Sequence, residues 1–132
     1  SDVCSSDLKV SENFSRYEFE CQCGCGFAAA DVTLLEALED ARAHFKKTYT
    51  NRKVIISVTS GNRCHKHNRK VGGAADSHHV KGMAADFVVN NVHADEVADY
   101  LEDKYPDRFG IGRYNDRTHL DSRTKPARWD LR

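Results

Sequence analysis

The stretch SHHVKGMAAD, residues 77–86, is the segment around which the rest of the chain can be organised. It places His79 and Asp86 seven residues apart, and a third candidate ligand, His119, follows much later. Imidazole nitrogen and carboxylate oxygen are both ligands that Zn²⁺ accepts in proteins. Three protein ligands leave a fourth position for water, as in catalytic rather than structural zinc sites. The stretch therefore predicts a zinc centre with an open position.

Asp86 and His119 fall on predicted strands, whereas His79 falls in a polar loop predicted over 74–81. Met83 to Val89 alternates so that Asp86 shares a face with its second neighbours, while Phe87 points to the opposite face. A hairpin is predicted from 109–114 and 118–122, turning at Asn115 and Asp116. In its second strand His119 and Asp121 share one face, and Leu120 points into the core. Strand surfaces would give these ligands a rigid support.

Two helices and a further strand complete the expected core. Leu34, Leu38, Ala41 and Phe45 recur at helical spacing within a helix predicted from Asp31 to about Tyr49. Its start is either a Thr33–Glu36 capping box or Asp31. The other elements expected are a strand over 54–58, a helix over 95–104 that ends before Pro106, and short helices over 14–19 and 63–71.

This order of elements predicts an α+β fold, with a small antiparallel sheet and flanking helices. Residues 1–9 show no periodicity and are expected to be a disordered tail. Residues 10–132 are expected to form a single domain, which we expect to be monomeric.

Composition excludes some functions. The chain has 132 residues, with 20 Lys and Arg against 20 Asp and Glu, so its formal net charge is zero. A balanced charge argues against nucleic-acid binding, which usually rests on a basic surface. No apolar run reaches the ~20 residues needed to span a bilayer. The first residues are polar and show no signal peptide, so we expect synthesis in the cytoplasm unless processing has already occurred.

Five cysteines are present, three of them in Cys21-Gln22-Cys23-Gly24-Cys25. An odd number does not fit a complete disulfide framework. Three states of the cysteines are compatible with the sequence: buried or free thiols, one disulfide to Cys64, or a small cysteine-rich metal site.

The pattern Ser-x-His-x-x-Gly-x-Ala-x-Asp over residues 77–86, followed by His119-x-Asp121, resembles the M15 zinc peptidases. These include D-Ala-D-Ala carboxypeptidases and phage L-alanyl-D-glutamate endopeptidases, and they share the fold of the Hedgehog signalling domain. Further matches are Ser11-Glu12-Asn13-Phe14, Ser60-Gly61-Asn62-Arg63-Cys64, His67-Asn68 and Arg128-Trp129. The resemblance covers nearly everything after residue 9.

The resemblance implies that His79, Asp86 and His119 bind Zn²⁺. His78 falls on a variable position of the pattern and is expected at the rim of the site. Arg63 would donate to the scissile carbonyl oxygen or bind a substrate carboxylate, unless it forms only a surface salt bridge. Ser77 would bind the substrate peptide or simply shape the ligand loop.

The pattern offers two candidates for the catalytic base. Asp116 precedes His119 by three residues, where several M15 members carry Asp or Glu, and it is the first candidate. Asp121 is the rival, although orienting a ligand or binding Arg123 is its favoured role. The resemblance also implies that Cys64 lies within disulfide or shared-metal reach of the segment 21–25.

The resemblance thus predicts a zinc metallopeptidase that hydrolyses peptidoglycan stem peptides during lysis or remodelling of the cell wall, phage-encoded or bacterial. Either the D-Ala–D-Ala or the L-Ala–D-Glu bond would be cut. The alternative is a non-catalytic zinc-binding interaction module like the Hedgehog domain. Retention of Arg63 and of a carboxylate near His119 favours the enzyme.

Overall fold

The structure is a computed structural model that describes residues 9–23, 31–61, 71 and 83–132. In chain order its elements are β1 (Lys9–Ser11), β2 (Phe14–Ser15), the 3₁₀ helix η2 (Arg16–Phe19), α1 (Val32–Thr48), β3 (Ile56–Ser60), β4 (Ala84–Val89), α3 (Ala94–Lys104), β5 (Gly110–Arg113), β6 (Thr118–Asp121) and β7 (Ala127–Asp130). Among the described residues, no helix combines the length and apolar character needed to cross a membrane.

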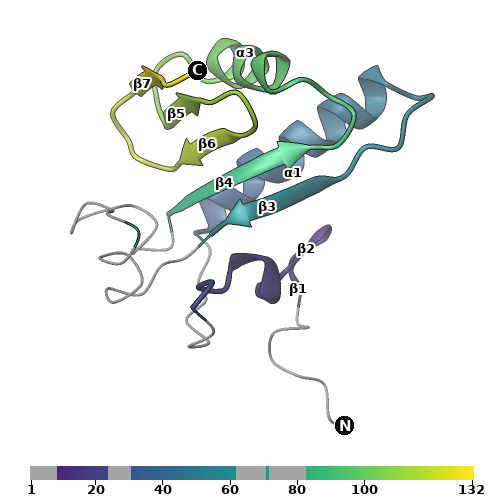
Figure 1. Ribbon diagram of the computed structural model, residues 1–132, viewed down its shortest axis with the longest axis horizontal. Helices are drawn as coiled ribbons and strands as arrows, with labels where there is room; N and C mark the ends of the chain where they lie inside the picture. The colour runs from purple at the N-terminus through teal and green to yellow at the C-terminus, as the bar shows by residue number, and fades with distance from the viewer. Residues whose placement is uncertain (1–8, 24–30, 62–70, 72–82) are drawn as a thin grey trace, which may run out of the picture.

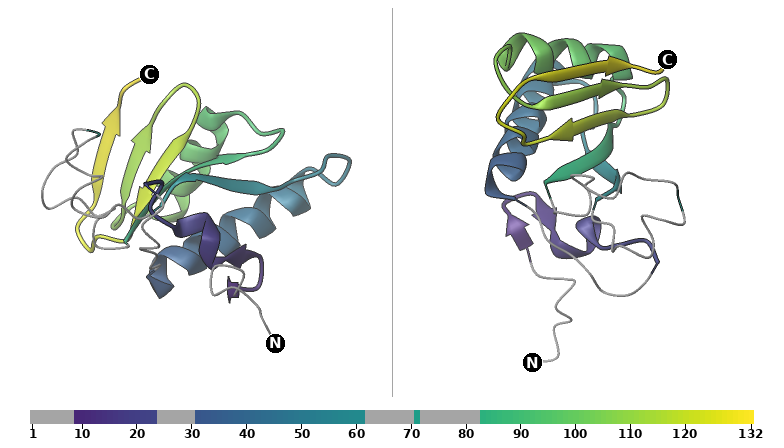
Figure 2. Two further views of the ribbon diagram at one scale, coloured as in Figure 1. Left: turned by 60° about the horizontal axis from the view of Figure 1, so that its bottom comes forward. Right: turned by 90° about the vertical axis from the view of Figure 1, so that its left-hand side faces the viewer.

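Five strands form the main sheet in the order β3-β4-β6-β5-β7, and β1 and β2 form a separate two-stranded sheet (Figure 1). Neighbours in the main sheet are antiparallel, except that β7 pairs with β5 in parallel. The predicted α+β fold is confirmed, and the parallel edge strand makes the sheet mixed. Figure 2 shows α1 and α3 on the same side of this sheet.

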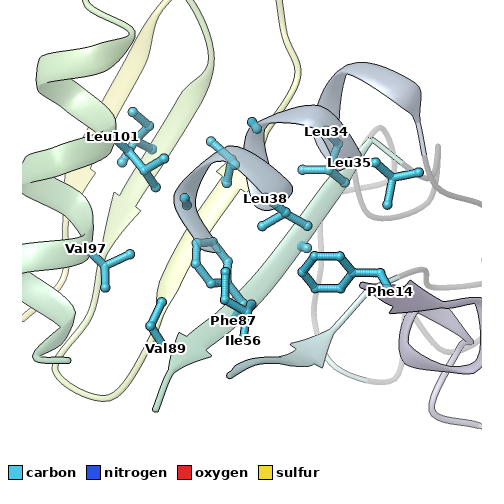
Figure 3. Close-up of a cluster of buried hydrophobic side chains, with 14 of the residues drawn as sticks. Phe14, Leu34, Leu35, Leu38, Ile56, Phe87, Val89, Val97 and Leu101 are labelled. Atoms are coloured by element: carbon cyan, nitrogen blue, oxygen red, sulfur yellow. The ribbon is translucent and has the colours of Figure 1, made fainter. Parts of the chain in front are cut away.

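The core lies between the helices and the sheet. Phe87 and Val89 of β4 and Leu120 of β6 are buried in one cluster with Leu38 of α1 and Leu101 of α3. Figure 3 shows the side chains of α1 directed toward those of the strands. Every second residue of β4 therefore belongs to the core, as the predicted alternation requires.

Both helices begin at a side-chain cap. Asp31 caps α1, because its carboxylate accepts a hydrogen bond from the Leu34 amide at 3.3 Å. Asp31 is thus the cap, rather than the alternative box at Thr33. His93 caps α3 by accepting from the Asp95 amide through Nδ1 at 3.2 Å. Both caps satisfy amide groups that the first turn of a helix leaves without a partner.

The helix predicted over residues 14–19 is wrong. Phe14 and Ser15 form β2, and only Arg16–Phe19 is helical, as one 3₁₀ turn. Phe14 and Phe19 are both buried, with ring centroids 6.1 Å apart. Residues five apart lie on different sides of an α-helix, so an extended pair followed by a tight turn is what brings both rings into the core.

Two other boundaries differ from expectation. The strand predicted over 54–58 is found at Ile56–Ser60, because β4 pairs with residues up to Ser60, opposite Asp86. The segment around Trp129, for which no strand was predicted, forms β7. Hydrogen bonding to a neighbouring strand, rather than local composition, sets both limits.

The two-stranded sheet is attached to α1 by one carboxylate. Glu39 accepts hydrogen bonds from the Ser11 hydroxyl and from both the amide and the side chain of Asn13, each at 2.7 Å. These bonds hold the β1–β2 turn against α1.

The predicted boundary at residue 10 lies one residue after the start of β1.

Candidate active site

The site is built on a row of residues that crosses the sheet. Asp86 of β4 lies opposite His119 of β6, His119 lies opposite Gly112 of β5, and Gly112 lies opposite Trp129 of β7. Their neighbours Phe87 and Leu120 point into the helix-covered core. The row therefore lies on the sheet face opposite the helices, which we call the open face.

Asp86 and His119 are in direct contact on this face. His119 Nδ1 lies 2.9 Å from Asp86 Oδ1. Both side chains are largely buried, with 10% of His119 and 17% of Asp86 exposed. Two of the three predicted ligands, 33 residues apart in the sequence, are thus brought together by the β4–β6 register.

Asp121 fixes the other side of the His119 ring. Its Oδ2 lies 2.8 Å from His119 Nε2, and its side chain is fully buried. Arg123 donates to both carboxylate oxygens, from Nε at 2.7 Å and from Nη2 at 2.8 Å. The Gly110 amide donates to Oδ1 at 3.1 Å. Asp121 is therefore held from several directions, and the Arg123 contact that its sequence position suggested is present.

These contacts shift two pKa values in opposite directions. Burial disfavours the imidazolium, but hydrogen bonds and charges from Asp121 and Asp86 outweigh it and raise the pKa of His119. Burial also disfavours the Asp121 carboxylate, but hydrogen bonds from His119 and Arg123 hold its pKa well below the ordinary value. Asp121 is therefore a carboxylate acceptor rather than a proton donor toward His119.

Two glycines of β5 give this arrangement its space. A Cβ on Gly110 would lie 2.2 Å from Asp121 Oδ2, and one on Gly112 would lie 2.3 Å from Trp129 Nε1. Both distances are too short for any side chain. The Trp129 ring lies over Gly112 and reaches His119, with ring centroids 4.8 Å apart. Trp129 thus covers the β5 side of the histidine.

The turn between β5 and β6 carries a second group of polar side chains. The Tyr114 hydroxyl accepts a hydrogen bond from Trp129 Nε1 at 3.2 Å. The Arg117 guanidinium lies 4.0 Å from the centre of the Tyr114 ring, and its Nε is 4.0 Å from Asp86 Oδ2. Asp116 is 78% exposed and pairs with Arg117 Nη1 at 2.9 Å. Arg117 thus lies between the carboxylates of Asp116 and Asp86 as an ion-pair partner of both.

The donor set fits a zinc ion. Within residues 9–23, 31–61, 71 and 83–132, no three His, Cys, Asp or Glu side chains form a group that could hold a metal. Asp86 and His119 supply one carboxylate and one imidazole, the donor types that zinc prefers. When His119 donates its Nε2–H to the Asp121 carboxylate in a hydrogen bond, its Nδ1 carries a lone pair, which then faces the Asp86 oxygen as a second acceptor. A cation would stabilise two such facing acceptors. Metal-bound histidines commonly donate their other N–H to a carboxylate in this way.

Several predicted residues lie outside the part of the chain that the structure describes. They are the third ligand His79, the substrate-binding candidates Arg63 and Ser77, the neighbouring His67 and His78, the short helix predicted over 63–71 except for Val71, and Cys64. Of the cysteine segment, Cys21 is buried and its Sγ lies 3.4 Å from that of Cys23. The predicted proximity of Cys64 to this segment stays a prediction.

The family model described as peptidase M15 matches residues 12–121, from the β1–β2 turn to Asp121 at the end of β6. This chain belongs to the peptidase M15 family. The comparison with curated proteins gives no match. Membership of M15 indicates a peptidase of peptidoglycan-type substrates, in a family whose members are generally zinc-dependent.

Part of the candidate site was not identified from the sequence. Gly110 and Gly112 were not predicted as site residues, although glycines inside a predicted strand commonly mark a close approach of another group. Trp129 was noted only as part of a family match, and it is the pairing of β7 with β5 that puts it beside His119. No local signal in the sequence predicts that pairing.

Proposed function

We propose that this M15 peptidase is zinc-dependent and hydrolyses a peptide bond of the peptidoglycan stem peptide, acting on the cell wall as a monomer through one domain, residues 10–132. His79, Asp86 and His119 are the proposed metal ligands. The observation that carries the proposal is the contact of Asp86 with His119 Nδ1, while Asp121 holds Nε2. This arrangement orients one histidine nitrogen toward the carboxylate that would share the metal with it.

A bound zinc ion would act as a Lewis acid, polarising the scissile carbonyl and lowering the pKa of an attacking water. The protein has to orient its ligands, bind the peptide and move protons. Asp121 orients the His119 ring through Nε2, and Arg123 and the Gly110 amide keep Asp121 in place. Trp129 covers one side of that ring and limits access of water to it.

Asp116 is the proposed general base. It takes a proton from the attacking water and returns it to the leaving amine. Its exposure and its position in a turn leave its carboxylate accessible. Asp121 is the poorer candidate, because its side chain is fully buried and its oxygens already accept from His119, Arg123 and Gly110. We therefore assign Asp121 a positioning role.

Arg63 and Ser77 complete the proposed site on the substrate side. Arg63 donates to the scissile carbonyl oxygen or to a substrate carboxylate, for which the planar guanidinium is suited. Ser77 binds the substrate peptide. The bond that is cut is either D-Ala–D-Ala, as in a carboxypeptidase, or L-Ala–D-Glu, as in an endopeptidase.

Mass spectrometry of purified muropeptides, after digestion with and without a chelator, tests the function and identifies the bond. We expect one of the two products, its loss on chelation and its return on adding Zn²⁺. A protein that binds zinc but releases no product under any of these conditions would contradict the peptidase and favour a binding module.

Matched substitutions distinguish the roles of the Asp116 and Asp121 carboxylates. Asp116→Asn should keep zinc and lower kcat by on the order of 10²–10⁴-fold, because the amide cannot accept the proton. Asp121→Asn should lower zinc affinity or activity by about 10–100-fold, because it disturbs the orientation of His119. Zinc content and kcat of both variants are the measurements. A normal rate for Asp116→Asn, beside an inactive Asp121→Asn that still holds zinc, would move the base role to Asp121.

A further inference from the structure

Arg117 is a cation placed at the edge of the candidate site and left without a role by the proposed mechanism. It precedes Thr118, whose side chain is buried, and it is two residues from His119. The alternation along this strand puts Arg117 on the open face. Its Nε lies 4.0 Å from Asp86 Oδ2, so its guanidinium adjoins one of the proposed metal ligands.

The position of this guanidinium is fixed by aromatic contacts. It lies over the Tyr114 ring, at 4.0 Å from the ring centre. The Tyr114 hydroxyl is in turn bonded to Trp129 Nε1, and Trp129 packs beside His119. An arginine stacked on an aromatic ring keeps its N–H donors, which lie in the guanidinium plane, directed away from the ring. The stack therefore presents hydrogen-bond donors beside the Asp86–His119 pair.

The ion pair between Arg117 and Asp116 is one that an anionic ligand can displace. Asp116 accepts from Nη1 at 2.9 Å, but Asp116 is 78% exposed and Arg117 is 36% exposed. An ion pair in such a setting contributes little stability, typically below about 1 kcal/mol. A substrate carboxylate could join or replace Asp116 at low cost in free energy.

The surrounding charges show why such a cation is needed. Asp86, Asp116 and Asp121 are all acidic, and the nearby Arg123 is already bound to both oxygens of Asp121. A carboxylate that approaches Asp86 from the β5–β6 turn would otherwise meet like charge. Among the described residues of this turn, Arg117 is the group that can offset it.

We propose that Arg117 binds a carboxylate of the peptide substrate, on the residue that carries the leaving amine. This inference rests on the proposed function, and it gives a reason for its two candidate bonds. In D-Ala–D-Ala and in L-Ala–D-Glu the residue on the amine side is D-Ala or D-Glu, and both can present a free carboxylate. Arg117 therefore selects acidic over amidated substrates whichever bond is cut.

The test compares Arg117→Gln with the matched control Arg52→Gln. Arg52 lies over the Tyr49 ring at 4.1 Å, the same kind of contact, in the turn between α1 and β3. Substrates are paired peptides with a free carboxylate or an amide on the leaving residue. Arg117→Gln should raise KM for the acid by on the order of 10-fold more than KM for the amide, the effect of losing one charge-assisted hydrogen bond. Arg52→Gln should change neither.

A binding measurement keeps this inference separate from the proposed function. The metal-stripped protein is titrated calorimetrically with the acid and the amide peptide, so no hydrolysis is required. We expect preference for the acid in the unsubstituted protein, loss of that preference in Arg117→Gln and partial retention in Arg117→Lys, which keeps the charge but not the planar fork. Equal or absent binding of acid and amide by the unsubstituted protein, or an unchanged preference in folded Arg117→Gln, would overturn the inference. If Arg117→Gln does not fold, an acid preference in Arg117→Lys as strong as in the unsubstituted protein would do the same.

Discussion

The two faces of the main sheet differ in what holds them, although the same strands supply both. On the helix-covered face, Phe87, Leu120 and their neighbours pack as an apolar cluster with α1 and α3. On the open face, Asp86 and His119 meet through hydrogen bonds that continue to Asp121 and Arg123. The structure of the helix-covered face depends on how apolar side chains fill the available volume. The structure of the open face depends on the positions of individual polar atoms.

Adjacent residues of one strand point to opposite faces. Substitutions at neighbouring positions can therefore change the stability of the fold and the chemistry of the site separately. Packing tolerates many apolar side chains of similar volume. A hydrogen-bonded chain does not tolerate loss of a member, since its buried partner is then left unsatisfied. Substitutions at adjacent positions of β4, β5 and α1 test the distinction.

The largest effect is expected from the neighbours Phe87 and Asp86. Phe87→Ala should lower the free energy of unfolding by about 3–5 kcal/mol, because it leaves a cavity in the core. Asp86→Asn should lower it by only about 1 kcal/mol in metal-free protein, through one weakened hydrogen bond, yet abolish zinc binding and activity. Urea denaturation with chelator, zinc content and peptide hydrolysis are the measurements. Equal losses of stability would contradict the division into two faces.

An intermediate effect is expected on β5. Gly112→Ala places a Cβ where the Trp129 ring lies, so the ring must move, at a cost of about 1–3 kcal/mol. Because the chain has one tryptophan, its fluorescence emission reports this movement directly. The matched control is Ile111→Val on the core side, which should cost about 0.5–1.5 kcal/mol and leave the emission unchanged. An emission shift in Ile111→Val alone would reverse the assignment of the two faces on this strand.

The smallest effect concerns the polar attachment of the β1–β2 sheet to α1. Burial raises the pKa of Glu39, but hydrogen bonds from Ser11 and Asn13 and the charge of Arg42 outweigh it, so the pKa is lowered from its ordinary value of 4.5. The stabilisation is therefore present above pH 4.5 and is lost as the pH falls through the lower folded-state value. Glu39→Gln should lower the free energy of unfolding by about 1 kcal/mol at neutral pH.

Denaturant unfolding of both proteins as a function of pH measures this effect. The difference in unfolding free energy between Glu39→Gln and the unsubstituted protein should shrink on acidification. A difference that stays constant down to pH values well below 4.5 would show that the carboxylate charge does not contribute.

The core-facing half of the fold was predictable because it follows periodicity. The stripe from Leu34 to Phe45 predicted α1 and the residues it buries. Alternation placed Asp86 opposite in direction to Phe87, and His119 opposite to Leu120, and the structure confirms both. Burial of apolar area imposes these patterns on the sequence itself, so no knowledge of distant partners was needed.

The rest depends on contacts between distant segments. That Asp86 faces His119 follows from the β4–β6 register, and that Trp129 reaches His119 follows from the parallel pairing of β7. Neither pairing has a signature in the local sequence. The residue pattern over 77–86 nominated Asp86 through a family resemblance, which the match over residues 12–121 confirms at the level of the family.

The strand order has a consequence for how the site responds to fluctuations. Asp86 and His119 belong to β4 and β6, which have a hydrogen-bonded strand on each side, whereas β3 and β7 are edges. Backbone amides of such inner strands usually exchange with solvent deuterium only through the rarest openings, and those of edges exchange sooner. We therefore expect Asp86 and His119 to stay in register while β7 detaches and returns. Trp129 would then uncover and cover His119 without any movement of the β4–β6 pair.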